Sequence, residues 1–244
     1  MITKDYKKVP DSYLENIDVQ NAVLAKELNI EWRLYQTAKE ASFLKLKDHK
    51  PDFPGRLSFR LLNPMKNPMG KVSKTILERI NCDLRNRLGL QQWQSTSDSL
   101  RWFDEIQDKD KKKFFQFDIE NFYGSISQEL LLRALNWARE HTFIADKSIQ
   151  IILTSRKSCL FDGQSLWVKK SNPDHDVTMG SWDGAEVAEL IVLYILFRLT
   201  EVKKIFNKQD IGLFRDDGLA VIQGSGHVID TKRKNAIKFF KKRA

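Results

Sequence analysis

"IGLFRDDGLAVI", residues 211–222, places two adjacent aspartates and a glycine between two apolar runs. Apolar runs on both sides of such a bend predict a β-hairpin. An ordinary Asp-Gly turn explains the bend, because aspartate tolerates unusual backbone angles and Gly218 can adopt a positive φ. That explanation gives no role to the neighbouring charges of Asp216 and Asp217. The rest of the chain decides whether they have one.

The composition is that of a folded protein whose charge is unevenly placed. The chain has 244 residues, 41% of them hydrophobic, which is enough for one large domain or two small ones. The formal net charge is +9, but residues 231–244 alone hold seven basic and no acidic side chains. This segment therefore predicts an anionic partner, although a solvated helix face explains the charge nearly as well.

Cysteine content and hydropathy exclude several classes of protein. Cys82 and Cys159 are far apart and form no CxxC pattern, which argues against a zinc site or a disulfide scaffold and suits a reducing compartment. Residues 1–13 contain no apolar stretch of the kind found in secretory signals. The longest apolar run, Leu190 to Phe197, is too short to span a bilayer. We expect an intracellular protein, nuclear or cytoplasmic, without a membrane partner.

The spacing of apolar residues gives a coarse order of elements. Helices are expected over 18–29 and 71–88, from about 96–99, from about Ser127 as N-cap, and within 177–199 as a long buried helix. Strands are expected within 43–64, over Phe114–Phe117, within 158–170 around Asp162–Gly163, and in the hairpin at 211–222. Helices that alternate with antiparallel hairpins predict an α+β fold.

Asp118 follows the strand over Phe114–Phe117 and gives the aspartate pair a candidate partner. Two Mg²⁺ ions about 3.5–4 Å apart require carboxylates that converge in space. One acid at a strand end and another at a hairpin tip converge if their strands are neighbours. Bound cations would also remove the repulsion between adjacent carboxylates. The alternative is that both features are purely structural.

Three strings occur in the order and at about the spacing of the central palm motifs of reverse transcriptases. They are "FFQFDIENFYGSIS" (114–127), "VTMGSWDGAEVAEL" (177–190) and "LFRDDGLAV" (213–221), with "LKLKDHK" (44–50) and "RLSFRLLNPMKNPMGKVSK" (56–74) upstream. From about residue 40, the chain resembles retroelement reverse transcriptases of the type found in invertebrate animals.

The resemblance implies an organisation of the chain. It implies a right-hand polymerase fold with fingers and palm, in which helices back an antiparallel palm sheet and the thumb is absent. The corresponding divisions are an N-terminal helical extension at 1–40, a fingers-like region at 41–112 and a palm truncated before the thumb at 113–244.

The resemblance also implies roles for particular residues. Asp118 and Asp216 would coordinate two Mg²⁺ ions, for which Mn²⁺ can substitute, with the carbonyl of Ile119 assisting and Asp217 supporting the site. Tyr123 would be a steric gate that collides with a ribose 2′-OH, and Gly180 would let the chain pass under the incoming base pair. The nucleotide-binding set is completed by Asn121, Phe122, Lys47 and Arg60.

Structural explanations compete with several of these roles. Tyr123 can be a core aromatic residue, Gly180 an ordinary helix-entry glycine, and Lys47 and Arg60 solvated surface charges. For the C-terminal segment we expect a helix with Ile237 and Phe240 against the palm. Its cations would bind nucleic acid, namely Lys232, Arg233, Lys234, Lys238, Lys241 and Lys242.

The function implied is that of an RNA-directed DNA polymerase fragment. It would use an RNA template, a DNA or RNA primer and deoxynucleoside triphosphates (dNTPs), with help from a thumb or further domains. A catalytically incompetent nucleic-acid-binding remnant is the alternative, and an RNA-dependent RNA polymerase is disfavoured by Tyr123.

Overall fold

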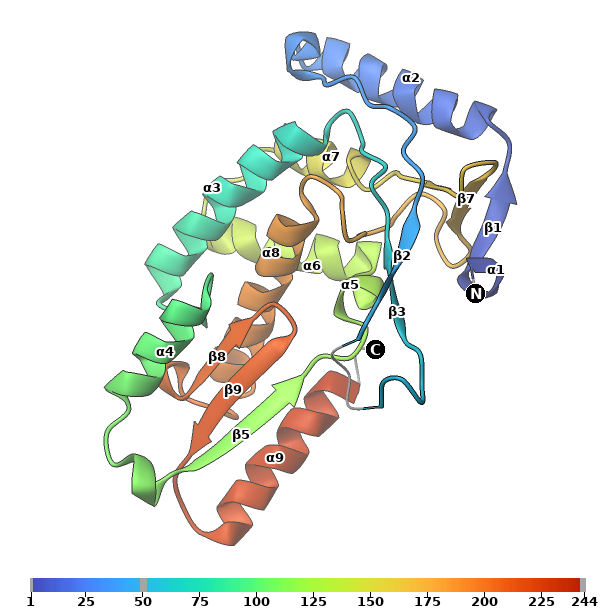
Figure 1. Ribbon diagram of the computed structural model, residues 1–244. Coiled ribbons are helices and arrows are strands. Elements are labelled where there is room, and N and C mark those ends of the chain that lie inside the picture. Colours follow the sequence, from blue (N-terminus) through green and yellow to red (C-terminus); the bar gives the residue numbers. More distant parts are fainter. Residues whose placement is uncertain (1, 49–51, 242–244) are drawn as a thin grey trace. The chain divides into compact units, whose positions relative to one another are not determined.

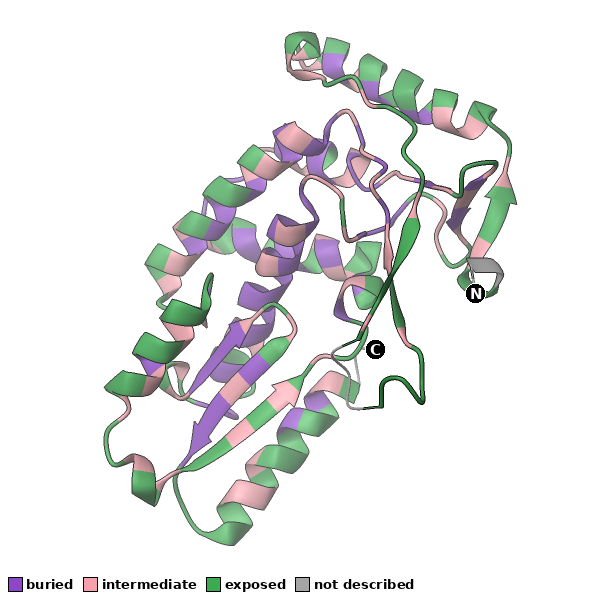
Figure 2. Ribbon diagram, in the orientation of Figure 1, coloured by how far each residue is buried: buried purple, intermediate pink, exposed green. Residues whose placement is uncertain are grey.

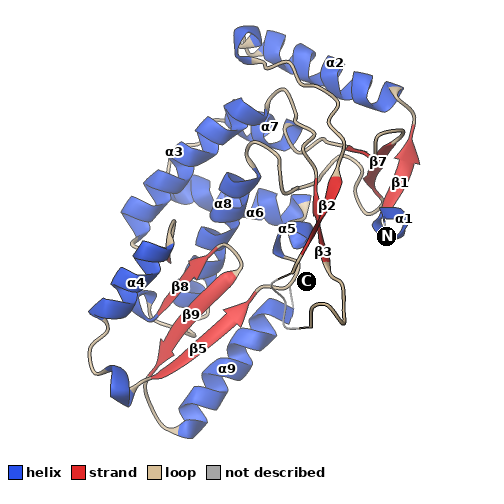
Figure 3. Ribbon diagram, in the orientation of Figure 1, coloured by secondary structure: helices blue, strands red, loops and turns tan. Residues whose placement is uncertain are grey.

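The computed structural model describes residues 2–48 and 52–241, which form two compact units. The first contains the described residues of Met1–Glu78, Ile126–Glu129 and Ile144–Val187. The second contains Arg79–Ser125, Leu130–Phe143 and the described residues of Ala188–Ala244. Helices and strands alternate along the chain (Figure 1 and Figure 3), which confirms the expected mixture of the two. The domain boundaries proposed at residues 40 and 112 stay a prediction.

A three-stranded sheet belongs to the first unit. Strand β7 (Leu166–Lys169) pairs antiparallel with both β1 (Tyr6–Val9) and β6 (Leu160–Phe161). The β6–β7 hairpin contains the predicted Asp162–Gly163 turn, and Gly163 has a φ of +95°. The sequence did not predict β1, because two lysines interrupt its apolar alternation.

The first unit also contains a separate hairpin and several helices. β2 (Phe43–Leu46) pairs antiparallel with β3 (Phe59–Leu62), within the range predicted for two strands. The helices are α1 (Ile2–Asp5), α2 (Ser12–Glu27), the 3₁₀ turn Glu31–Arg33 and α7 (Asp146–Thr154). Helix α2 begins at Ser12 and not at residue 18, because Tyr13 and Leu14 in its first turn already pack against a buried cluster of the first unit. Helices α3 (Gly70–Leu88) and α8 (Gly184–Phe197) contribute residues to both units.

The second unit is built on a sheet in the order β4-β8-β9-β5. β4 (Gln91–Gln92) is parallel to β8 (Ile211–Phe214), whereas β8, β9 (Asp217–Ile222) and β5 (Lys113–Asp118) are antiparallel neighbours. Most residues of β8 and β9 are buried, while those of β5 are exposed or half-buried and alternate from Phe114 onward (Figure 2). One face of β5, which carries Phe114, Gln116 and Asp118, is therefore exposed to solvent.

The helices of the second unit include α4 (Thr96–Glu105), which begins where the sequence predicts. Ser95 and Asp98 form a capping box, in which each side chain accepts a hydrogen bond from the backbone N–H of the other. The remaining helical segments are α5 (Phe122–Ser125), α6 (Gln128–His141, whose first two residues belong to the first unit), α9 (Gly226–Lys241), the 3₁₀ turns Lys109–Lys111 and Lys208–Asp210, and the π-helical turn Arg198–Val202. None of the helices in the described residues is long and apolar enough to cross a membrane.

Helix α9 packs through Phe240, as predicted, but not through Ile237, the other residue of the predicted stripe. Ala236 and Phe239 are buried, and the half-buried Phe240 contacts Phe117 on β5 with ring centroids 5.4 Å apart. Ile237 is 41% exposed, so its expected place against the sheet is wrong. The buried face follows the helical spacing of Ala236 and Phe239, which rotates Ile237 toward solvent.

A buried ion pair joins two loops of the first unit. The side chains of Arg156 and Asp183 pair with each other and are each 1% exposed. Ser155 Oγ donates a hydrogen bond to Asp183 Oδ2 at 2.7 Å. Because removing one partner leaves an uncompensated buried charge, breaking such a pair costs about 3–5 kcal/mol. The pair therefore fixes the residues after α7 to the residue that precedes α8.

His175 is a buried imidazole of the first unit. Its Nε2 lies 3.0 Å from the carbonyl oxygen of Ile126, and this nitrogen must carry the proton to donate to that acceptor. The pKa of His175 is lowered to about 4, chiefly by burial and to a smaller extent by the neighbouring Arg156, while the hydrogen bond to Ile126 opposes this shift. The folded protein therefore keeps this side chain neutral below the pH at which an unfolded histidine takes up a proton.

This difference in pKa predicts a loss of stability in mild acid. Between pH 6.5 and pH 4 the unfolded chain protonates His175 and the folded chain does not, so the free energy of unfolding falls as the pH falls. The full difference corresponds to about 3 kcal/mol. His175→Gln, whose amide can still donate to Ile126, should flatten the dependence between these pH values in denaturant titrations. The exposed His227→Gln is the matched control, and an equal flattening there would contradict the assignment.

Candidate active site

The antiparallel register of β5 and β9 brings the predicted acids together. Asp118 lies directly opposite Asp217, and the Ile119 N–H donates a hydrogen bond to the carbonyl of Asp216 at 2.8 Å. Directly opposite residues of an antiparallel pair share one face of the sheet, with Cβ atoms about 4.5–5.5 Å apart. The carboxylates of Asp118 and Asp217 thus share a face, and Asp216 occupies the adjoining turn.

The hairpin turns on Arg215 and Asp216, not on Asp217 and Gly218. Arg215 has a φ of +55°, which costs a residue with a side chain about 1–2 kcal/mol. Gly218 lies inside β9, so the interpretation of this glycine as the turn residue with positive φ is wrong. The turn falls earlier because the β8–β9 register already pairs Phe214 with Asp217.

Gly218 is needed for packing. It is the cross-strand partner of Phe117, and a Cβ atom on Gly218 would overlap the Phe117 ring. The ring therefore occupies the space that a side chain at position 218 would fill. This contact pins the register that places Asp118 opposite Asp217.

The three carboxylates of Asp118, Asp216 and Asp217 suit Mg²⁺ better than they suit a metal whose ligands all come from the protein. Asp118 and Asp217 are exposed and Asp216 is half-buried. Two unit charges about 5 Å apart in water repel by about 1 kcal/mol, which a divalent cation would reverse. Within residues 2–48 and 52–241, no group of three or more His, Cys, Asp or Glu side chains is arranged to hold a metal ion. Mg²⁺ commonly takes one or two carboxylates and completes its shell with water and substrate phosphates, so the residues present are compatible with it.

The residues after Asp118 form a tight turn into α5. Asn121 has a φ of +50°, a backbone conformation that asparagine tolerates well. Phe122 is buried, and Tyr123 is half-buried with its ring edge-on to Phe122 at a centroid distance of 5.9 Å. Tyr123 lies five positions after Asp118 in the sequence and is partly exposed. Both the gate and the core-aromatic interpretations allow this.

Three other predicted nucleotide-binding residues lie in the first unit. Gly180 has a φ of +116°, and a Cβ atom there would overlap the carbonyl oxygen of Asn63. This close approach gives Gly180 a structural role within the first unit. Lys47 is half-buried directly after β2, and Arg60 is exposed on β3. Their predicted roles toward a nucleotide stay predictions.

The predicted nucleic-acid-binding cations lie on α9, except for Lys242, which lies outside the described residues. Arg233, Lys234, Lys238 and Lys241 are exposed, and Lys232 is half-buried with its Nζ 5.9 Å from the Phe206 ring centroid. Lys234 and Arg233 pair with Asp230 at 2.7 and 2.8 Å, and they lower the pKa of that carboxyl. Lys238 and Lys241 carry the remaining exposed charge of the described part of the helix.

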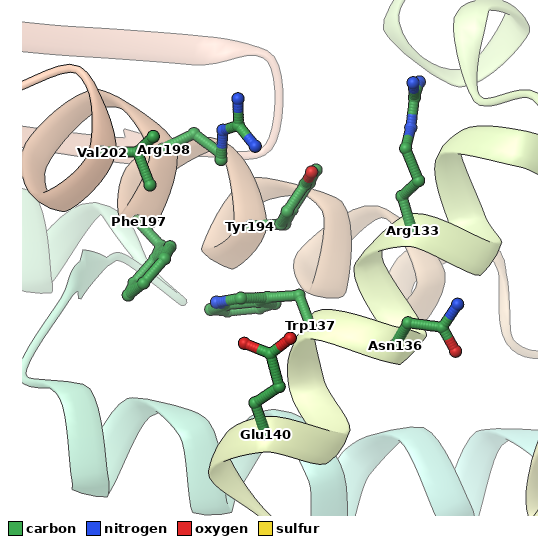
Figure 4. Close-up of a pocket in the computed structure, with 8 residues that line it drawn as sticks. All are labelled: Arg133, Asn136, Trp137, Glu140, Tyr194, Phe197, Arg198 and Val202. Carbon is green, nitrogen blue, oxygen red and sulfur yellow. The ribbon is translucent and has the colours of Figure 1, made fainter.

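A shallow pocket of about 340 Å³ in the second unit involves none of the predicted residues (Figure 4). Trp137 of α6 lies between Tyr194 and Phe197 of α8, with ring centroids 5.5 and 5.2 Å away. The other lining residues are Arg133, Asn136, Glu140, Arg198 and Val202. Trp137 and Tyr194 are nearly fully buried, so the pocket offers little aromatic surface to a ligand.

Two residues within the quoted strings, Arg215 and Asp183, were given no role from the sequence. Arg215 stands in the quoted hairpin, but its positive φ depends on where the turn falls, which the sequence pattern misplaced by two residues. Asp183 lies in the string at 177–190, and its ion pair with Arg156 could not be found because that residue belongs to no motif.

Comparison with known proteins supports the fold class. No protein-family model and no curated protein matches the chain. A telomerase from Candida albicans, solved with a fragment of telomeric RNA, matches 94% of this chain at 13% identity with a TM-score of 0.54. A Candida tropicalis telomerase matches 70% of the chain at 17% identity (TM-score 0.46), and the RNA-dependent RNA polymerase of bacteriophage phi12 matches 73% at 14% (TM-score 0.49).

The Candida albicans match shows that this chain shares its fold with part of that telomerase. The chain spans less than half of each of these solved proteins, namely 42%, 36% and 30%. Activity, substrates and partners therefore have to be argued from the site.

The packing of Gly218 predicts a rescue between two substitutions. Gly218→Ala should lower the free energy of unfolding by about 1–3 kcal/mol, because the added methyl group overlaps the Phe117 ring. In a Phe117→Ala background the same change should cost little, since the overlapping ring is gone. Denaturant titration of the four proteins measures the coupling. Additive effects would show that the two residues do not pin the register.

Proposed function

We propose that this protein is a nucleotidyltransferase of the RNA-directed DNA polymerase type and belongs to an invertebrate-type retroelement. The observation that carries the proposal is the β5–β9 register, which sets Asp118 opposite Asp217 and hydrogen-bonds Ile119 to Asp216. The fold shared with a telomerase supports it independently. In this proposal residues 113–244 supply the palm, and the β2–β3 hairpin belongs to the fingers.

Asp118 and Asp216 are proposed to hold two Mg²⁺ ions, with the Ile119 carbonyl as a further ligand and Asp217 in support. The ions, when bound, stabilise the charge that develops as a primer 3′-hydroxyl displaces pyrophosphate from the α-phosphate. The protein's own contribution is to hold its carboxylates on adjacent backbone segments, so that they need not reorganise during the reaction. The hydrogen bond between Ile119 and Asp216 supplies that rigidity at the backbone.

Tyr123 is proposed to select dNTPs. Its ring is held edge-on by the buried Phe122, in the first helical turn after the loop that begins at Asp118. A ring fixed in this way would collide with a 2′-hydroxyl group, which is the chemical feature that separates ribonucleotides from deoxynucleotides.

The nucleic-acid partners are proposed to be an RNA template and a DNA or RNA primer. The exposed cations of α9, chiefly Lys238 and Lys241, supply charge for phosphate contacts. Since Ala236 and Phe239 are buried, charge-neutralising substitutions test this helix better than deletion of residues 231–244, which would also remove packing. The telomerase that shares this fold is longer than this chain, and we propose that a thumb or further domains assist the reaction.

Primer extension with and without Mg²⁺ tests the proposal. Asp118→Asn and Asp216→Asn should each lower the rate at least about 100-fold, because each removes a charged metal ligand, and Asp217→Asn should have a smaller effect. Asp110→Asn, at an exposed position of the second unit, is the matched control and should leave the rate unchanged. Equal activity of the Asp118 variant and the control would contradict the assigned site.

The same assay separates the enzyme from a catalytically incompetent nucleic-acid-binding remnant. The exposed cations of α9 are the observation that favours the remnant, because they need no metal site to bind RNA. A chain that binds primer–template but extends no primer, alone or with a C-terminal extension, would establish the remnant and overturn the enzyme.

A further inference from the structure

Arg215 occupies the tip of the hairpin in a conformation that glycine would adopt without strain. It is the first of the two turn residues and has a φ of +55°. The two aspartates, Asp216 and Asp217, follow it directly, so the turn places one cation beside the carboxylates. Residues with strained backbone angles cluster at active sites and ligand-binding turns, and Arg215 lies at such a candidate site.

The guanidinium of Arg215 lies over the Phe214 ring. Its Cζ lies 5.3 Å from the ring centroid, within the range of a cation–π contact. Phe214 is paired with Asp217, and Asp217 with Asp118, so all three side chains belong to one face of the sheet. We call this face, with its members Phe214, Asp118 and Asp217, the carboxylate face.

The positive charge of Arg215 remains available to a ligand. The side chain is exposed, and it forms no ion pair with another residue in the described part of the chain, the neighbouring aspartates included. The carboxylate face is also open at this end, since Gln116, Asp118 and Asp217 are all exposed. A polyanion that approaches this face meets carboxylates first, and the guanidinium of Arg215, held near the Phe214 ring, is a cation in the adjoining turn.

We propose that Arg215 binds a phosphate group of the reacting nucleic acid. A planar guanidinium presents two parallel N–H donors and can bind phosphate through both. The phosphate belongs either to the backbone of the primer strand near its 3′ end or to the incoming dNTP, and the chemistry of recognition is the same. This inference rests on the proposed function, because that function brings phosphates to the carboxylate face.

Binding of a fluorescein-labelled DNA primer annealed to an RNA template, followed by anisotropy at two salt concentrations, tests the primer-strand source. Arg215→Gln should weaken binding about tenfold and make the slope of log K against log salt shallower by about 0.9 for one lost duplex contact. Arg215→Lys should keep the slope, because it keeps the charge, and lose part of the affinity with the two-donor geometry. Arg215→Gly should lose affinity while its thermal stability is equal to or above that of the wild type, which excludes unfolding as the cause.

The matched control is Arg101→Gln on α4, which removes one exposed arginine from the same unit. Its binding and salt slope should equal those of the wild type. A raised KM for dNTP with unchanged primer–template binding in Arg215→Gln assigns the phosphate to the nucleotide. If Arg215→Gln matches Arg101→Gln in primer–template binding and in KM, the inference is overturned.

These outcomes separate the inference from the proposed function. The binding measurement requires no catalysis, so Arg215-dependent binding by a chain without polymerase activity would overturn only the enzyme. Full polymerase activity with binding and KM independent of Arg215 would overturn only the phosphate contact.

Discussion

The contact of Phe117 with Gly218 is the constraint on which the candidate site depends. The Phe117 ring occupies the space above Gly218, and this packing specifies one register between β5 and β9. A slip of a single residue would turn every side chain of β5 to the other face of the sheet and move Asp118 away from Asp217. The hydrogen bond from Ile119 to Asp216 continues the same register beyond the end of the strand. The arrangement of carboxylates on which the proposed function depends therefore comes from ordinary strand packing.

Much of this fold could be predicted from apolar spacing, whereas register and turn position could not. The strand before Asp118, the hairpin at 211–222 and the start of α4 follow from local pattern and capping, and the structure contains all three. The turn was misplaced onto Gly218 because that glycine serves a ring on another strand, which sequence spacing does not reveal. Ile237 was misplaced because several rotations of an amphipathic helix fit the same sequence, and only packing selects one.

Long-range polar contacts inside the first unit were also beyond sequence reasoning. Arg156 and Asp183 are 27 positions apart and meet in the interior, and His175 donates to a carbonyl 49 positions away. These groups hold the loop that leads into α8, the same loop in which Gly180 approaches Asn63. Residues 177–183 of the string thus have a structural explanation within the first unit, independent of any nucleotide. Its resemblance to a polymerase motif and its packing role are compatible, because a loop that binds a substrate must first be held in place.

Direct binding of Mn²⁺ tests the central claim that Asp118 and Asp216 form a metal site. Electron paramagnetic resonance of a Mn²⁺ titration counts bound ions without requiring a nucleic acid or any turnover. If Asp118 and Asp216 form the site, the wild-type chain binds Mn²⁺, Mg²⁺ competes for the same site, and the Asp118→Asn/Asp216→Asn double variant loses this binding while remaining folded. Equal Mn²⁺ binding by the wild type and the double variant would contradict the account.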